Sequence, residues 1–213
     1  MKKLFVILIL FTASYSIFAQ HGAGAIKLGI FGPNASDNGF IIGYENSNIV
    51  DQNFRLGWSV DWFHVNYTDK KLVGDYTNFF GNNDQVNELR AKTNLHDFPI
   101  QLTASANFPI NPVMDVYVIG GIGAEILLIN YRNFVNPDED EFKAAFSLNW
   151  RIGAGFSYAF SKRADVFGEL TYHSASPSWD YEVKDPVTNR TRTYEREFDM
   201  SGMMFRLGLR FFY

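Results

Sequence analysis

Eight stretches of this chain alternate apolar and polar residues with a period of two, the pattern of a β-strand whose two faces meet different surroundings. The clearest alternation sets large apolar residues against small or charged ones: Phe54, Leu56, Trp58, Val60 and Trp62 against Arg55, Gly57, Ser59 and Asp61. The eight predicted strands are residues 25–31, 39–45, 54–67, 95–108, 115–131, 144–160, 165–174 and 203–213. The pattern predicts an all-β protein.

The segments between these strands are sorted by length. Long polar segments follow the third, fifth and seventh strands, at residues 68–94, 132–143 and 175–199, whereas the connections after the second, fourth and sixth are short. In an antiparallel up-and-down arrangement, all the long segments then fall at one end. Outer-membrane barrels show this asymmetry, with short periplasmic turns and long extracellular loops. Within the fourth strand, Pro99 cannot donate to a ladder, so we expect it near the loop end or at a bulge.

The final strand carries a more specific signal. The run Arg206-Leu207-Gly208-Leu209-Arg210-Phe211, followed by Tyr213, resembles the C-terminal signature of bacterial outer-membrane β-barrels. The resemblance implies that this strand closes the barrel and is read by the insertion machinery, with Gly208, Leu209, Phe211 and Tyr213 as the assembly signal. It implies an eight-stranded antiparallel up-and-down transmembrane β-barrel of the OmpA/OmpX type, in the outer membrane of a Gram-negative bacterium.

The N-terminus and the composition agree with this class. Met1-Lys2-Lys3 and the apolar run at 4–11 read as a secretory signal peptide, which we place at residues 1–19. Residues 20–213 are then one barrel domain, within the size of a single all-β unit. The chain has no cysteine, so no disulfide framework is expected, and its net charge of −4 gives no reason to expect nucleic acid binding.

The polar faces of the predicted strands contain a balanced set of charges interleaved with glycines. This interior network comprises Lys27, Glu45, Arg55, Asp61, Glu125, Arg151, Glu169, Arg206 and Arg210. The interior of an eight-stranded barrel is just wide enough for side chains to fill. An ion path or a catalytic carboxylate pair is one possible use of these charges. We favour a salt-bridged core that plugs the barrel, because unpaired charges in a confined interior are costly.

Two other groups of residues suggest chemistry. His173 and Ser174 or Ser176 weakly resemble the His and Ser of lipid A 3-O-deacylase barrels, although the family spacing is His-x-Ser and no Asn follows. The acidic run at 138–141 could bind divalent cations, but such runs are more often solvated loops. We therefore assign no catalytic, cofactor-binding or metal-binding residue and do not predict an enzyme.

The predicted function is a structural or surface-interaction role through residues 68–94 and 175–199. The expected partners are outer-membrane lipid and lipopolysaccharide, the barrel assembly machinery and an extracellular ligand, and we expect a monomer. Two alternatives remain. One is a lipid A-modifying barrel esterase using His173, and the other is a secreted soluble barrel that binds an apolar ligand with its aromatic face turned inward.

Overall fold

The computed structural model describes residues 22–51, 53–68, 92–132, 140–184 and 191–213. The predicted signal peptide, most of segment 68–94 and the first half of the acidic run lie outside the described residues. The strands are β1 (Gly22–Pro33), β2 (Gly39–Ile49), β3 (Phe54–Thr68), β4 (Lys92–Asn111), β5 (Met114–Arg132), β6 (Asp140–Ser161), β7 (Ala164–Ala175), β8 (Ser178–Lys184), β9 (Thr191–Glu197) and β10 (Gly202–Phe212).

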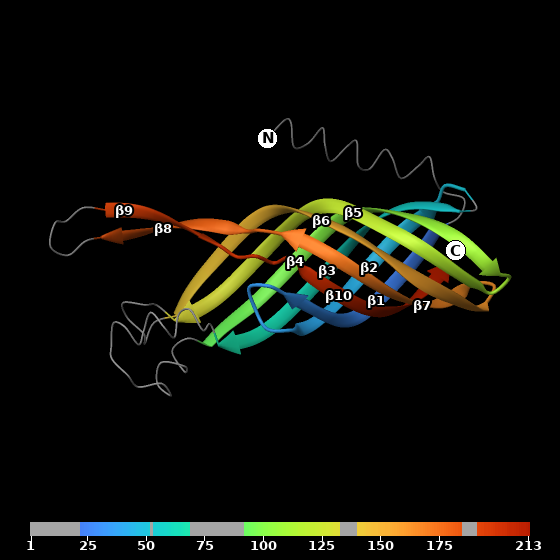
Figure 1. The fold of residues 1–213 in the computed structure, drawn as a ribbon, viewed down its shortest axis with the longest axis horizontal. Helices are drawn as coiled ribbons and strands as arrows, with labels where there is room; N and C mark the ends of the chain where they lie inside the picture. Colours follow the sequence, from blue (N-terminus) through green and yellow to red (C-terminus); the bar gives the residue numbers. More distant parts are fainter. Residues whose placement is uncertain (1–21, 52, 69–91, 133–139, 185–190) are drawn as a thin grey trace.

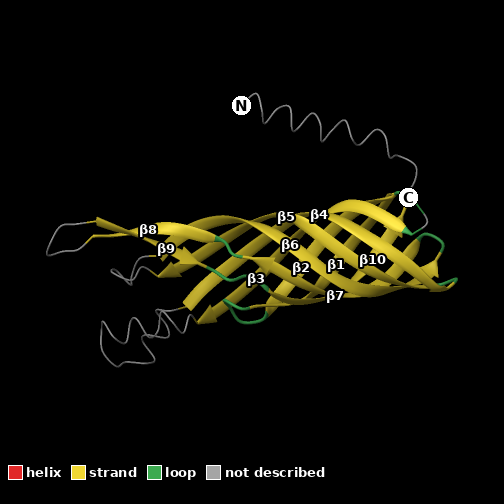
Figure 2. Cartoon of the chain, turned by 45° about the horizontal axis from the view of Figure 1, so that its top comes forward, coloured by secondary structure: helices red, strands yellow, loops and turns green. Residues whose placement is uncertain are grey.

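Eight of these strands form a closed antiparallel barrel. Neighbours in the chain pair from β1 to β7, and β10 pairs with both β7 and β1 to complete the ring. The strands run obliquely around the barrel (Figure 2). Among the described residues, none forms a helix long and apolar enough to cross a membrane. The predicted fold class is confirmed.

The barrel strands are longer than the alternation predicted. For example, β4 runs from Lys92 to Asn111, whereas the sequence predicted residues 95–108. The ladder continues past the apolar residues because backbone hydrogen bonds do not depend on side-chain polarity. The first described residue and the last residue of the chain meet at the short-turn end, where the amide of Gly22 donates to the carbonyl of Tyr213 at 3.0 Å.

One prediction about the connections was wrong. We expected residues 175–199 to be a polar segment without strands, but β8 and β9 form an antiparallel hairpin there. This hairpin joins the barrel through the pairing of Ser178 with Phe146 of β6, and it projects beyond the end opposite the C-terminus (Figure 1). Residues 178–184 do alternate, but the stretch is short and rich in charge, which concealed the signal.

Pro99 is also not where we expected it. It lies inside β4, on the buried face, and the register of β4 with β3 has no bulge at this point. Val60 pairs with Ile100 and Phe63 pairs with Asp97, but the two pairs expected between them are absent. The missing N–H of proline therefore interrupts the ladder locally without shifting its register.

Most of the large apolar side chains of the barrel face outward. Leu148 is 79% exposed and Ile122 is 66% exposed, whereas the charged side chain of Arg206 is fully buried. A soluble barrel with an apolar ligand requires the reverse orientation. This apolar belt is the surface that a lipid bilayer covers, because lipid-facing and interior residues alternate along each strand of a membrane barrel.

Candidate functional site: the polar interior and the barrel ends

The predicted interior network lies inside the barrel. Eight of its nine members are buried, each at most 5% exposed, and Arg55 is half-buried near the short-turn end. They come from seven different strands, and each sits at a position that alternates with a lipid-facing residue. The period-two pattern alone therefore brings residues distant in sequence into one small volume.

Asp61 lies at the centre of this network. Its Oδ2 is 2.9 Å from Nη1 of Arg151 and 2.9 Å from Nη1 of Arg206. Arg206 also contacts Glu169, with Nη2 2.6 Å from Oε1. Since one carboxylate links two guanidinium groups and one guanidinium links two carboxylates, the network is continuous across the barrel.

Lys27 extends the network. Its Nζ lies 3.3 Å from Oε1 of Glu169 and also forms an ion pair with Glu45. The hydroxyl of Tyr117 donates to Glu169 Oε2 at 3.3 Å. This central group holds three cations (Lys27, Arg151, Arg206) and three carboxylates (Glu45, Asp61, Glu169). The charges balance, which is the condition under which buried ions are tolerated.

Glycines make room for these side chains. A Cβ added at Gly43 would collide with the carboxylate of Asp61 on the neighbouring strand. A Cβ at Gly155 would meet the ring of Tyr117 in the same way. At these two positions, the missing side chain leaves space for the polar side chain of the facing residue.

A second ion pair lies closer to the short-turn end. Arg210 Nη1 is 3.1 Å from Oδ2 of Asp165, and the Arg210 guanidinium carbon lies 4.5 Å from the centre of the Phe167 ring. The sequence analysis missed Asp165 because it stands at the first position of its predicted strand. It has the same parity as Glu169, so the alternation within the predicted strand already assigns it to the polar face.

The third polar group contains the histidine of the esterase alternative. His173 is fully buried, and its Nε2 lies 2.6 Å from Oε2 of Glu125. Asp97, which the network prediction also missed, is fully buried on β4, the strand that pairs with the β5 strand of Glu125. His173 shares the parity of Glu169, which is the signal that predicts an inward position.

The structure does not bring His173 together with either candidate serine. Ser174 is the next residue along β7 and so lies on the opposite face, where its hydroxyl accepts a hydrogen bond from Ser201 at 3.2 Å. Ser176 follows the end of the strand and is exposed. The hydrogen bond between a base and its nucleophile that serine hydrolysis requires is therefore absent at these residues.

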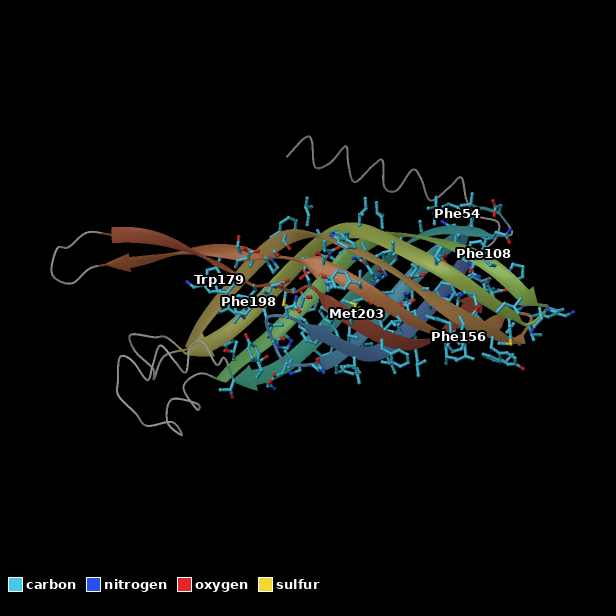
Figure 3. All side chains as sticks on the ribbon, viewed as in Figure 1. Phe54, Phe108, Phe156, Trp179, Phe198 and Met203 are labelled. Atoms are coloured by element: carbon cyan, nitrogen blue, oxygen red, sulfur yellow. The ribbon has the colours of Figure 1, made fainter. Side chains whose placement is uncertain are left out.

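Apolar side chains fill the barrel between this polar interior and the end with the hairpin. Along β3 they follow Asp61, and along β5 they follow Glu125. We call this cluster the apolar cap: Phe31, Ile41, Phe63, Val65, Tyr67, Leu95, Leu127, Ile129, Ala145, Ala175, Trp179, Phe198, Met200 and Met204. Figure 3 shows Trp179 and Phe198 at the base of the hairpin, far from Phe54 and Phe108 at the other end. The sequence analysis did not predict the cap, because it treated inward positions as polar.

The base of the hairpin is tied to the turn between β1 and β2. The side-chain amide of Asn34 donates to Oδ2 of Asp199 at 2.9 Å, and the amide of Ser201 donates to Oδ1 at 3.0 Å. Burial raises the pKa of the Asp199 carboxyl, but these hydrogen bonds outweigh it and leave the pKa below its usual value. The contacts fix the hairpin base against the barrel rim.

The predicted assembly signal lies on the closing strand. Leu209, Phe211 and Tyr213 face outward, whereas Gly208 packs against the ring of Phe167. The hydroxyl of Tyr213 accepts a hydrogen bond from the side-chain amide of Asn46 at 2.7 Å. These contacts join the closing strand to β7 and the end of the chain to β2.

Solved structures share this architecture. A major outer membrane protein from Thermus thermophilus matches with a TM-score of 0.62 at 12% identity, over 92% of this chain and 100% of that chain. The fold is that of a small outer-membrane β-barrel. Together with the apolar belt, this fold places the protein in the outer membrane.

Two further barrels match less closely. Neisserial surface protein A has a TM-score of 0.47 at 12% identity, over 90% of this chain and 95% of that chain. The attachment invasion locus protein Ail of Yersinia pestis has a TM-score of 0.47 at 10% identity, over 91% of this chain and 98% of that chain. No family model matches the chain, and no curated protein matches it.

Proposed function

We propose that this small outer-membrane β-barrel is plugged and acts as a structural or surface-interaction protein through the segments at its hairpin end. The observation that carries the proposal is the continuous bridge from Arg151 through Asp61 and Arg206 to Glu169, which crosses the interior. An interior filled by paired side chains has no continuous path for water or solutes.

The apolar cap supports the same proposal. Phe31 and Phe63 meet in an edge-to-face contact with ring centres 5.0 Å apart, and Trp179 stacks on Phe198 at 5.3 Å. These rings lie between the ion network and the hairpin end, so a solute would have to pass both groups. Binding would then depend on the hairpin and on residues 68–94. The expected partners are lipopolysaccharide, the assembly machinery and an extracellular ligand, with the barrel as a monomer.

Two measurements on the full chain test this function. Gel migration in SDS with and without boiling tests the closed barrel, and we expect a shift in mobility on boiling. Recordings in planar bilayers test the plug, and we expect no discrete conductance steps. Steady conductance from heat-modifiable protein would contradict the plug, whereas recovery in the soluble fraction without a mobility shift would contradict the membrane barrel.

The surface role has its own test. Replacing residues 178–197 by a short Gly-Ser turn should weaken binding of whole cells to extracellular matrix or host-cell surfaces and leave the mobility shift intact. Unchanged binding by such cells would exclude the hairpin as the interaction surface.

A further inference from the structure

The outward face of β3, β4 and β5 changes character near the hairpin end. Asn66 pairs in register with Asn94, and Asn94 pairs with Asn130, so one row of asparagines crosses three neighbouring strands. All three have lipid-facing parity, and Asn66 and Asn130 are exposed. Further toward the centre of the barrel, the same faces carry exposed apolar residues such as Ile100 and Ile126. On β3 to β5, the outward face therefore changes from apolar to polar at this row.

Three aromatic rings stack directly beneath the asparagine row. His64 and His96, which oppose each other across β3 and β4, have ring centres 4.5 Å apart. The indole of Trp62 lies nearly parallel to the His96 ring, at 6.0 Å and 9°. We call Trp62, His64, Asn66, Asn94, His96 and Asn130 the outer-rim site.

The hydrogen bonds of this stack fix which ring nitrogens carry protons. Trp62 Nε1 donates to His96 Nδ1 at 3.1 Å, so neutral His96 must carry its proton on Nε2. His64 Nδ1 lies 3.2 Å from the carbonyl of Leu95, which can only accept, so neutral His64 carries its proton on Nδ1. The remaining His64 nitrogen, Nε2, lies 3.5 Å from the side-chain amide of Asn66 and accepts from it, so the ring group open to a ligand is the His96 Nε2–H donor.

These tautomers are unfavourable for a metal ion. A metal on His96 Nε2 would need the proton moved to Nδ1, where it would oppose the Trp62 N–H. Among the described residues, no group of three or more His, Cys, Asp or Glu side chains is arranged to hold a metal. A hydrogen-bonding organic group suits these carboxamides and the His96 N–H better than a metal ion does.

The chemistry of the outer-rim site matches an amphiphilic sugar. Carboxamides donate and accept hydrogen bonds, as sugar hydroxyl and amide groups do, and none of the six residues is a carboxylate that would repel an anion. Lys92 and Arg132 occupy positions two residues further out than Asn94 and Asn130 on β4 and β5. The apolar surface beneath the row would contact acyl chains.

We propose that the outer-rim site binds the phosphorylated amino-sugar headgroup of an outer-leaflet glycolipid. The proposal rests on the membrane-embedded orientation of the proposed function, because the site must lie at the headgroup level of the leaflet on the hairpin side. The acyl chains pack on β3 to β5, and the headgroup lies against the asparagine row and the Nε2–H of His96.

The test uses folded full-length protein in detergent, with purified lipid A as the probe and phosphatidylglycerol as the competitor, measured by native mass spectrometry. His96→Phe keeps an aromatic ring and removes the donor, and Asn94→Ala removes one carboxamide. Each variant should weaken lipid A binding about threefold to tenfold, the effect of one lost hydrogen bond. Asn48→Ala is the matched control, because Asn48 also has outward parity but lies on β2 at the short-turn end of the barrel, away from the outer-rim site.

Wild-type affinity in both His96→Phe and Asn94→Ala would overturn the proposal. Displacement of lipid A by equimolar phosphatidylglycerol would overturn it as well, because the surface would then bind any anionic lipid. The mobility shift on boiling, measured on the same preparations, separates the two proposals. If the mobility shift is present but neither variant weakens lipid A binding, only the outer-rim site is refuted. If the mobility shift is absent, both the membrane barrel and the site are refuted.

Discussion

Asp61 and Arg206 meet at 2.9 Å in the centre of the barrel, although 145 residues separate them in the chain. Arg206 belongs to the closing strand β10, whereas Asp61 lies on β3, three strands around the ring through β1 and β2. The contact thus spans the interior between strands that do not pair with each other.

Replacing Asp61 by Asn should strongly destabilise the barrel. Arg151 and Arg206 would each lose an ion pair while remaining buried, and breaking a buried pair in this way costs about 3–5 kcal/mol. Urea titration of the protein folded in lipid vesicles measures the change in unfolding free energy. The matched control is Asp37→Asn in the exposed turn after β1, which should change stability by no more than about 0.5 kcal/mol. Equal stability of Asp61→Asn and wild type would show that the network carries no net stabilisation.

A charged residue introduced on the apolar belt should destabilise the barrel more strongly the closer it lies to the middle of the bilayer. Ile122 is 66% exposed near the middle of β5, and Ile122→Arg should lower the unfolding free energy of the protein by about 2–4 kcal/mol. Phe160 lies beside a short turn, and Phe160→Arg should lower it by only about 0–1 kcal/mol. The same vesicle titration measures both variants. A soluble barrel predicts little cost at either position, so a neutral Ile122→Arg would contradict the membrane assignment.

His173 should matter for stability and not for lipid chemistry. His173→Ala leaves a carboxylate oxygen of Glu125 buried without its partner, which should cost about 1–3 kcal/mol. Ser176→Ala, at an exposed position, should be close to neutral. Mass spectra of lipid A from cells carrying either variant should match the wild type. Acyl loss in wild-type cells that disappears in both variants would instead support the esterase alternative.

Removal of residues 211–213 should block assembly. Phe211 and Phe212 pair with Gly24 and Ala23 of β1, and Tyr213 exchanges backbone hydrogen bonds with Gly22, so the truncation opens the closing seam. The measurement is the amount of heat-modifiable protein in isolated outer membranes. Tyr213→Phe, which keeps the aromatic ring and loses the hydroxyl contact with Asn46, should assemble normally. Normal levels of the truncated chain would show that these residues are not part of the assembly signal.

Much of the architecture could be predicted because strand alternation is a local property. Each residue between Arg55 and Asp61 is assigned to a face by its immediate neighbours, and the same counting assigns Lys27, Glu169 and Arg206. Strand number and loop asymmetry follow from where such stretches begin and end. The hairpin of β8 and β9 escaped prediction because its stretches are short and rich in charge.

The sequence by itself determined which face of each barrel strand carries the charges, because parity depends only on counting along the strand. Only the tertiary structure decided which charges meet and where the polar interior gives way to the apolar cap. Those outcomes depend on the register between strands and on closure of the ring. Register brings Asp61 to Arg151 and Arg206, and it places His173 beside Glu125 instead of a serine. Contacts between strands that are not neighbours in sequence exist only once the barrel has closed.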